Sequence, residues 1–526
     1  MKNVRLWLLA LAILACLPAR ADDTFAPVRQ AIIEHLRTTN TASVVVAVSR
    51  GRQIVWEEAF GWANREKRIR ATTSTPYSLA SDTKPLTATA LMTLVEARKL
   101  DLDAPVNDYL GAAKLVAHIG DVRDATVQRV GNHSAGLPEH YQFFYKNEPW
   151  RTPSADGVIR EYGGLFAPPG EHYEYSNLGY AILGDVIARV AREPFAAYLR
   201  QAVFLPLAMT RTSIGADAPP GSAVRYGDDG RPVPLYDTDH AGASSGWASV
   251  DDLIRFAMFN LKLHLPNQKP ILTDADIDEL HTPTMDEGND NGDGYGLGWE
   301  TRYRSGYRLV EHTGDMPGVA AVIRMVPNER IAVIVLCNAE DFDFADAIAN
   351  QTLSVVLPHW QTPAGSDRPT APPQLPSPLL GHWRGTISIR GTLVPVTLTV
   401  ANARSARVRI GDEPETVVVG ARITKDGYFR GTASGNLHIP EASRRPYAIG
   451  FRLKLRDGGR RLAGEITARA DKRGVMSTAG WWPSGVGSPP SKYVQARGFV
   501  LAFWADLHFA HETPRVARVS RVAMWN

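Results

Sequence analysis

The spacing of apolar and polar residues predicts a first region in which strands at both ends of the segment enclose a helical part. Apolar positions three and four residues apart predict helices, whereas alternating or β-branched runs predict strands. The predicted helices are residues 27–38, 178–190 and 343–356, and the predicted strands are 43–49, 53–60 and several within 308–338. Helix and loop signals dominate residues 98 to about 240. This order predicts an α/β (α+β) fold, in which an antiparallel sheet is flanked by helices and an all-α part is inserted.

A further helix is predicted after residue 81, and it carries the most informative polar pair of the chain. Its apolar residues share one face and are Leu86, Ala90, Leu91, Leu94 and Val95. Ser81 and Lys84 precede them at i and i+3, a spacing that places both side chains on the same side of a helix. A buried lysine can be neutral enough to take the proton of a serine hydroxyl. The alternative is an ordinary helix start with a capping serine and a solvated lysine.

The character of the chain changes after residue 357. Residues 358–377 are rich in proline and poor in apolar residues, which predicts a linker. In residues 378–526, short runs separated by glycine and aspartate predict an all-β domain, a small barrel or a sandwich. The strands expected there are 386–400, 406–410, 416–419, 448–455 and 462–468. Aromatic residues near the end predict core and a docking surface between domains, or else a contact between subunits; they are Trp481, Trp482, Phe499, Phe503 and Trp504.

The N-terminus predicts export. Lys2 and Arg5 precede an apolar run at residues 6–17 that is too short to span a bilayer comfortably, and Ala19-Arg20-Ala21 forms an A-x-A cleavage site. We therefore expect residues 1–21 to be a signal peptide, residues 22–357 to form the first folded domain, and the protein to be periplasmic or secreted. An uncleaved anchor and a lipid-modified Cys16 are the alternatives.

Composition narrows the classes of partner. A length of 526 residues predicts two or three domains, and a content of 44% hydrophobic and 21% charged residues is typical of a soluble globular protein. A net charge of only +3 implies no nucleic-acid partner and no membrane-surface partner, and we expect no stable membrane span. Cys337 follows the apolar run 331–336, which predicts a buried strand and neither a disulfide nor a cysteine nucleophile.

Two later motifs make the serine–lysine pair part of a recognisable set. Tyr175-Ser176-Asn177 lies about 90 residues downstream, and His312-Thr313-Gly314 lies later still. In this order the three motifs resemble the set used by serine β-lactamases and penicillin-binding proteins. Further matches to these proteins are residues 94–105, 133–138, 168–170, 206–209 and 294–299. From about residue 27 to about residue 357, the chain resembles the class C β-lactamase-like branch of the penicillin-binding-protein family of serine hydrolases.

The resemblance implies a β-lactamase/transpeptidase-like fold and a covalent mechanism. Ser81 would attack the carbonyl of an ester or amide, Lys84 would prepare its hydroxyl for deprotonation, and Tyr175 would shuttle the proton, as a phenolate or through the lysine. Asn177 would hydrogen-bond the lysine or a substrate amide. The backbone N–H groups of Ser81 and Asp315 would form the oxyanion hole.

The element His312-Thr313-Gly314, with Asp315 after it, is implied to bind the substrate, but it departs from the family pattern. True β-lactamases usually have a lysine where this chain has His312. A lysine is a permanent cation that attracts carboxylates, whereas histidine is mostly neutral near pH 7. The resemblance therefore favours an esterase or a D-amino-acid peptidase over a true β-lactamase.

The sequence predicts neither a metal site nor another cofactor. Residues 286–294 hint at a calcium loop, but Gly298 stands where an EF-hand needs a glutamate. An H-E-x-x-H motif, which would indicate a zinc hydrolase, is absent from the sequence.

We expect an exported serine hydrolase that acts on a small-molecule or peptide substrate, resembling class C β-lactamases and D-Ala-D-Ala carboxypeptidases. The alternative is a penicillin-binding sensor or binding module that does not turn over. Near the start of the C-terminal domain, Gly381-His382-Trp383 resembles the G-x-W of lipocalin-like barrels. This domain could cap the cleft or mediate oligomers.

Overall fold

The computed structural model describes residues 23–287, 292–361, 375–402, 405–444, 446–470 and 499–510. The predicted signal peptide, most of the predicted linker, and Trp481 and Trp482 lie outside these ranges. Within them, no helix combines the length and the apolar character needed to cross a membrane.

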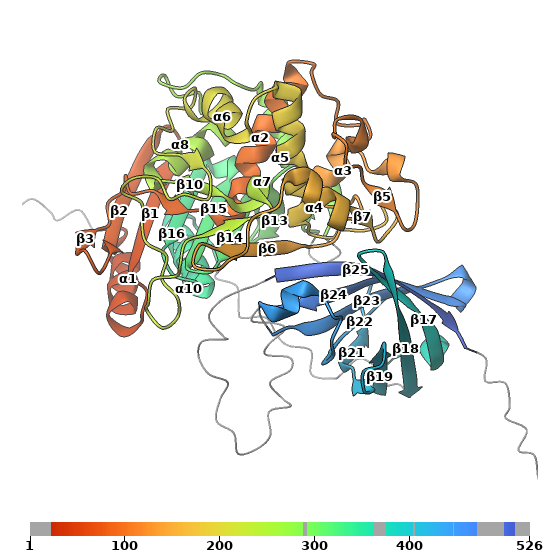
Figure 1. Cartoon of the computed structure of the whole chain (residues 1–526). Helices are drawn as coiled ribbons and strands as arrows, with labels where there is room; N and C mark the ends of the chain where they lie inside the picture. The colour runs from red at the N-terminus through yellow and green to blue at the C-terminus, as the bar shows by residue number, and fades with distance from the viewer. Residues whose placement is uncertain are drawn as a thin grey trace, which may run out of the picture.

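Nine strands of the N-terminal region form one antiparallel sheet, as the sequence predicts (Figure 1). Their order across the sheet is β11-β12-β13-β14-β15-β16-β1-β2-β3. The bounds are β1 (Ser43–Arg50), β2 (Gln53–Asn64), β3 (Ile69–Arg70), β11 (Met285–Asp286), β12 (Gly294–Tyr295), β13 (Glu300–Arg304), β14 (Tyr307–Met316), β15 (Val319–Val326) and β16 (Ile331–Cys337). β1 pairs with β16, with Val46 opposite Val335, so the two ends of the region meet at the centre of the sheet.

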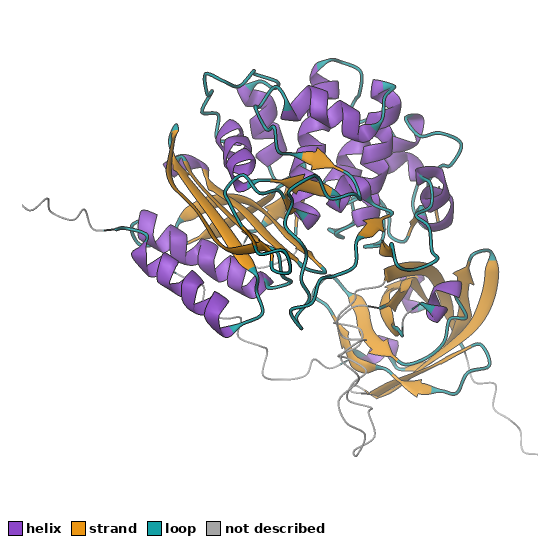
Figure 2. Cartoon of the chain, turned by 60° about the vertical axis from the view of Figure 1, so that its left-hand side comes forward, coloured by secondary structure: helices purple, strands orange, loops and turns teal. Residues whose placement is uncertain are grey.

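Helices cover both faces of this sheet (Figure 2). α1 (Ala26–Thr38) and α10 (Phe342–Val356) share a buried apolar cluster with Val44 and Val46 of β1. Val45 of the same strand belongs to a second cluster, formed with α2 (Thr83–Glu96) and α8 (Val250–Asn260). Because successive side chains of a strand point to opposite faces, the continuous apolar run Val44–Val48 of β1 is buried on both sides.

The inserted helical part packs on α2. Its helices are α3 (Val127–Gly131), α4 (Ala155–Tyr162), α5 (Asn177–Ala191), α6 (Phe195–Leu199), α7 (Ala241–Ser244) and α9 (Asp274–His281). Its short strands are β4 (Tyr77–Ser78), β5 (Val116–Ala117), β6 (Tyr141–Tyr145), β7 (Gly164–Leu165), β8 (Ser213–Ile214), β9 (Tyr236–Thr238) and β10 (Gly246–Ala248). The predicted helix 178–190 is α5, which contacts both α2 and α7 and so connects three segments distant in sequence.

The C-terminal residues form a nearly closed antiparallel barrel, in the order β20-β19-β18-β17-β25-β24-β23-β22-β21 (Figure 1). The bounds are β17 (Gly381–Ile389), β18 (Thr392–Asn402), β19 (Ser405–Ile410), β20 (Thr416–Val417), β21 (Val419–Ile423), β22 (Tyr428–Ala433), β23 (Ala448–Arg456), β24 (Arg461–Arg469) and β25 (Phe499–Phe509). β20 and β21 follow one another along the chain, at opposite ends of this order. Between them, the N–H of Val418 donates to the carbonyl of Ala406 at 2.8 Å, which nearly closes the barrel.

The structure corrects two details of the predicted barrel. Residues 386–400 were expected to be one strand, but they belong to a hairpin, β17 and β18, that turns at Arg390 and Gly391. Gly391 has φ +80°, a conformation that glycine adopts without strain. The pattern also missed the full length of β25, and it missed β22, where Gly431 interrupts a short strand.

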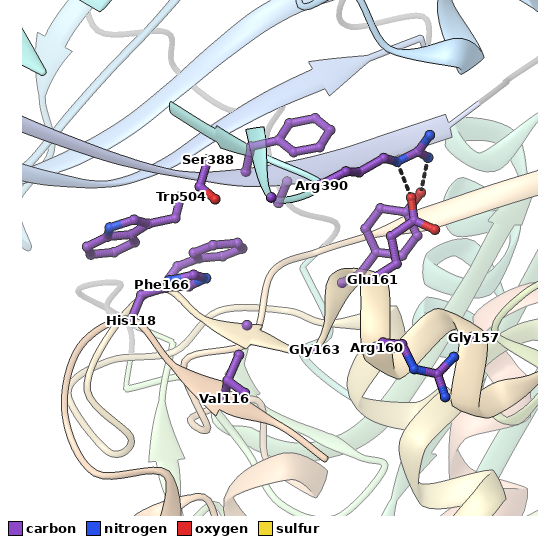
Figure 3. A pocket seen from close by; sticks show the side chains of 15 residues that line it. Val116, His118, Gly157, Arg160, Glu161, Gly163, Phe166, Ser388, Arg390 and Trp504 are labelled. Carbon is purple, nitrogen blue, oxygen red and sulfur yellow. Dashed lines mark hydrogen bonds and ion pairs between the residues drawn. The ribbon is translucent and has the colours of Figure 1, made fainter. Parts of the chain in front are cut away.

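The last strand docks the barrel onto the N-terminal region. Phe499 and Val500 of β25 pair with Gln142 and Tyr141 of β6. A crevice of about 590 Å³ lies beside this junction, and Figure 3 shows the near-parallel rings of His118, Phe166 and Trp504 in its wall. The aromatic residues of β25 therefore serve as core and as docking surface.

Candidate active site

Ser81 lies in a 3-10 turn, Ala80–Asp82, that leads directly into α2. Ala80 has φ +48°, a backbone conformation that is rare and costly outside glycine. The hydroxyl of Thr83 donates to the Ala80 carbonyl at 2.7 Å and accepts from the Gly246 N–H at 2.9 Å, which holds the turn in place. Such strain is typical of functional turns, because the surrounding structure has to stabilise it.

The 3-10 turn packs against β14, and a glycine permits the close approach. A Cβ atom at Gly314 would lie 2.0 Å from the carbonyl oxygen of Leu79, just before the turn. β13 pairs with β14 only as far as Glu311, so it does not cover the following residues of β14. The predicted strand motif thus lies beside the predicted nucleophile.

Lys84 is completely buried, and its amine contacts Ser81. Its Nζ lies 3.0 Å from the Ser81 Oγ, 2.9 Å from the Asn177 Oδ1 and 3.3 Å from the carbonyl of Ala243. Burial lowers the pKa of Lys84 well below its usual range, against the opposing charge of Asp82. A neutral Lys84 is a base within hydrogen-bonding distance of the Ser81 hydroxyl. Pro85 follows in the first turn of α2, where its missing N–H has no helical partner to lose.

The start of α5 brings Tyr175 and Asn177 to this pair. Ser176 caps the helix by accepting from the Gly179 N–H at 3.0 Å, and its own hydroxyl donates to the Pro138 carbonyl at 2.6 Å. The Ser176 N–H donates to the His133 Nδ1 at 3.0 Å. These bonds fix the backbone on both sides of the cap, so Tyr175 and Asn177 face the nucleophile from a rigid helix start.

Aromatic rings lie beside the amine of Lys84 and help to exclude water from it. Its Nζ lies 4.6 Å from the centre of the Tyr175 ring, and the imidazole of His133 lies 4.6 Å from the same ring. Burial raises the pKa of Tyr175 well above its usual value, although a hydrogen bond with Ser81 opposes this shift. Tyr175 is therefore a neutral phenol near neutral pH. Tyr175 was expected to shuttle the proton either as a phenolate or through Lys84. The raised pKa disfavours the phenolate, so the environment favours the route through Lys84.

The side chains of β14 alternate between the two faces of the strand, which divides the predicted substrate element. Thr313 and Asp315 line the cleft, as does Met316 at the end of the strand, whereas His312 and Gly314 do not. His312 is buried on the other face, with its Nε2 3.0 Å from the Tyr295 hydroxyl and its Nδ1 3.6 Å from an Asp82 oxygen. Burial lowers the pKa of His312, so it is neutral. The substrate role expected of this element stays a prediction, in which Thr313 and Asp315 line the cleft and His312 lies behind it.

The cleft has a volume of about 360 Å³. Its walls come from the turn of Ser81, from β6, from the start of α5 and from β14. The residues that line it are Ser81, Glu139, Tyr141, Phe143, Glu174, Tyr175, Asn177, His240, Thr313, Asp315 and Met316. The structure therefore brings together six of the eight predicted site residues at the surface of the cleft or directly behind it, since Lys84 contacts both Ser81 and Asn177.

His240 is a site residue that the sequence reasoning missed. Its Nδ1 lies 2.8 Å from Asp239, whose other oxygen lies 2.8 Å from the Nε2 of buried His140. Burial opposes ionisation of Asp239, but the two histidines hold its pKa well below the usual value. Burial lowers the pKa of His240. The cleft thus contains a neutral imidazole oriented by a carboxylate. Only the adjacency of Asp239 and His240 in the sequence could have indicated it.

The described residues contain no group of three or more histidine, cysteine, aspartate or glutamate side chains arranged to hold a metal ion. The acidic segment 286–294 lies partly outside the described residues. Asp293 of this segment forms an ion pair with Arg304 at 2.8 Å. Cys337 is buried in β16 with a free thiol, as expected, and burial raises its pKa.

Comparisons with known proteins agree with the fold. Protein flp of Staphylococcus aureus (strain MRSA252) is 24% identical over 319 residues, which cover 58% of this chain and 62% of that protein. This chain therefore spans less than two thirds of the length of that relative. The octameric penicillin-binding protein homologue from Pyrococcus abyssi has a TM-score of 0.54 and 21% identity, covering 84% of this chain and 97% of its own.

A third similar protein is the D-alanine carboxypeptidase AmpC from Burkholderia cenocepacia. Its structure has a TM-score of 0.52 and 21% identity, and the match covers 63% of this chain and 99% of its own. At such identities the likeness establishes the fold. The profile of the Beta-lactamase family matches residues 28–356, more than half of the chain and all of the candidate site. The protein described here belongs to the Beta-lactamase family.

Proposed function

We propose that the protein is a serine hydrolase that cleaves an ester or amide through an acyl-enzyme on Ser81. The observation that carries the proposal is the buried amine of Lys84, which lies 3.0 Å from the Ser81 hydroxyl and has a lowered pKa. A serine hydroxyl becomes a useful nucleophile only when a base takes its proton, and this amine is such a base.

In the first half of the reaction, the proton of Ser81 passes to Lys84 while the serine oxygen attacks the substrate carbonyl. The backbone N–H groups of Ser81 and Asp315 stabilise the resulting oxyanion. Tyr175, as a neutral phenol, gives its proton to the leaving group and regains one from Lys84. In the second half, a water molecule attacks the acyl-enzyme, and its proton returns along the same route.

The cleft favours a small ester or a D-amino-acid peptide over a β-lactam. On the strand beside the nucleophile, the family's cationic lysine is replaced by His312, which is buried, neutral and turned away from the cleft. The similarity to a D-alanine carboxypeptidase supports a peptide substrate. A sensor that is acylated but does not turn over is the second candidate. The neutral imidazole of His240 favours turnover, because it adds an acid–base group to the cleft that Ser81 also lines.

The proposal is tested by hydrolysis of para-nitrophenyl butyrate by the wild-type protein and by Ser81→Ala. Turnover by the wild type that disappears in the variant supports a serine hydrolase. A burst of nitrophenol that stops at one equivalent indicates the sensor. Equal turnover by both proteins would place the nucleophile elsewhere and refute the proposal.

We further propose that the chain is exported and that the barrel supports assembly of several copies. Export rests on the N-terminal sequence, and assembly on the octameric state of the similar archaeal protein. N-terminal sequencing of the protein recovered outside the cytoplasm tests the first, since the mature chain should begin at Asp22. Light scattering of the purified protein tests the second.

A further inference from the structure

The catalytic cleft continues into a second cavity, of about 370 Å³, against the barrel. Glu139 and Glu174 line both spaces. The barrel supplies the opposite wall of the second cavity from β21, β22, β23 and β24. Charged side chains line this wall, among them Arg430, Arg452, Glu465 and Arg469.

These side chains project from the outer face of the barrel. On β23, Phe451 belongs to the apolar core and its neighbour Arg452 does not; on β24, Ile466 belongs to the core and Glu465 does not. Because strand residues alternate, the polar set of neighbouring strands gathers on one outer face. This face is turned toward the N-terminal region, which contributes Glu139 and Glu174 to the same cavity.

Ion pairs fix the barrel against the edge of the cleft. Arg469 pairs with Glu139 at 2.5 Å, and Arg452 pairs with Glu174. Glu174 directly precedes Tyr175, so the barrel is tied to the chain segment that positions the predicted proton shuttle.

Two of the arginines still have unused donors. The Nε and Nη2 of Arg452 and the Nε of Arg430 are buried and lack a hydrogen-bond acceptor. Arg452 is only 8% exposed, and its guanidinium lies 4.3 Å from the ring centre of Tyr428. A further carboxylate, on Asp426, lies 3.9 Å from its Nη2, which is too far for a hydrogen bond. Buried guanidinium N–H groups without an acceptor are costly, which indicates that a ligand supplies one.

The charge in this cavity favours an anion. Arg430, Arg452 and Arg469 face Glu139, Glu174 and Glu465, but burial raises the pKa of Glu174 and raises that of Glu465 to about 7. The two glutamates also repel one another, so near neutral pH they carry less than two full charges. The lining arginines, with Arg422 as the fourth, then exceed the lining glutamates in charge, even when Asp426 beside Arg452 is included.

We propose that Arg430 and Arg452 form a subsite for a carboxylate group of the substrate, so that the barrel completes the substrate-binding site. This inference rests on the proposed hydrolase function, because it names the class of substrate that the same cleft accepts. A guanidinium binds a carboxylate through directed, charge-assisted hydrogen bonds. The barrel would thereby supply the cation that the strand beside Ser81 lacks at His312.

The test compares substrates that differ only in a carboxylate. The first pair is para-nitrophenyl hemisuccinate and para-nitrophenyl butyrate, in which the carboxylate lies on the acyl side. The second pair is acetyl-D-alanyl-D-alanine and its C-terminal amide, in which it lies on the leaving-group side. The measured quantity is the ratio of kcat/KM for the anionic member to that for the neutral member.

For at least one pair, we expect Arg452→Gln and Arg430→Gln each to lower this ratio about tenfold or more, mainly through a higher KM. Arg452→Lys should recover part of the preference, since it keeps the charge. Arg409→Gln, an exposed arginine on β19, is the matched control and should leave both rates unchanged. Ratios that stay the same in both cavity variants, for both pairs, would overturn the subsite.

A binding measurement separates this inference from the proposed function. Calorimetry with Ser81→Ala tests whether acetyl-D-alanyl-D-alanine or succinate binds, and whether Arg452→Gln in that background removes the binding. Carboxylate-dependent binding that the arginine variant abolishes supports the subsite even if the wild type hydrolyses none of the four compounds. Binding that is absent, or indifferent to Arg452, overturns it even if the neutral esters are cleaved.

Discussion

The amine nitrogen of Lys84 lies 3.0 Å from the hydroxyl oxygen of Ser81, in a position from which solvent is excluded. Burial disfavours the ammonium form, so the same fold that hides the lysine also makes it a base. The carboxyl of Asp82 acts in the opposite direction, because its negative charge favours the ammonium. In the proposed mechanism, the basicity of Lys84 thus depends on the balance between desolvation and the charges of Asp82, Glu300 and Glu139.

Lys84→Met should slow acylation of Ser81 by about 10²- to 10⁴-fold, the usual contribution of a positioned base. The measurement is the second-order rate of labelling by a fluorophosphonate. Lys99→Met, which removes an exposed lysine just after the same helix, should react like the wild type. A Lys84→Met protein that reacts at the normal rate would contradict the role of the lysine as a base, whatever its unfolding temperature.

The acylation rate should rise with pH as Lys84 loses its proton, with a midpoint well below the usual lysine pKa. Asp82→Asn removes the charge that favours the ammonium form, so its midpoint should lie at a lower pH than in the wild type. The check is the labelling rate measured from about pH 5 to about pH 11. A midpoint near the ordinary value for lysine would mean that another group controls the reaction.

Asp82→Asn should also stabilise the protein at alkaline pH. Burial raises the pKa of Asp82 from 3.8 to about 6, and neither of its oxygens has a hydrogen-bond partner within bonding distance. Between these values the folded state binds more protons than the unfolded state, so stability falls as pH rises. We expect the free energy of unfolding of the variant to exceed that of the wild type by up to about 3 kcal/mol near pH 8.

This difference should shrink as the pH falls and disappear below about pH 3, where the carboxyl is protonated in both states. Urea unfolding at the two pH values measures it. A variant less stable than the wild type at pH 8 would show that the Asp82 charge is compensated by His312.

Gly314→Ala should disrupt both the fold around Ser81 and its activity. A Cβ atom there would lie 2.0 Å from the Leu79 carbonyl, a backbone atom that cannot move without shifting the turn. We expect a loss of about 3 kcal/mol or more in the free energy of unfolding, together with slower labelling.

The matched control is Gly157→Ala in α4, where a Cβ would meet its nearest atom at 3.4 Å. It should change stability by no more than about 1 kcal/mol, in the stabilising direction, because alanine favours helices. Equal stability of the two variants would contradict the close packing of β14 on the turn.

The sequence predicted which candidate catalytic side chains lie together, because each of them is part of a short motif with its own local cause. Ser81 and Lys84 share one helical turn, and Tyr175 and Asn177 flank a helix cap. The order of the motifs along the chain was sufficient to predict that they meet. The antiparallel sheet was predicted for a similar reason, since apolar strands such as β1 and β16 have to be buried on both faces.

Other features depend on contacts between distant segments and could not be predicted. The orientation of His312 follows from the register of β14, which places Thr313 and Asp315 in the cleft instead. The pairing of β25 with β6 joins residues more than 350 positions apart, and no local pattern encodes it. The arginines that face Glu139 and Glu174 are scattered over three strands of the barrel, so only the folded chain brings them together.

The measurement that tests the central claim most directly is mass spectrometry of the intact protein and its peptides after reaction with a fluorophosphonate. We predict one adduct per chain, on the peptide that contains Ser81, and no adduct on the Ser81→Ala variant under the same conditions. An adduct on a different residue, or a Ser81→Ala protein that is labelled as fast as the wild type, would contradict the assignment of Ser81 as the nucleophile.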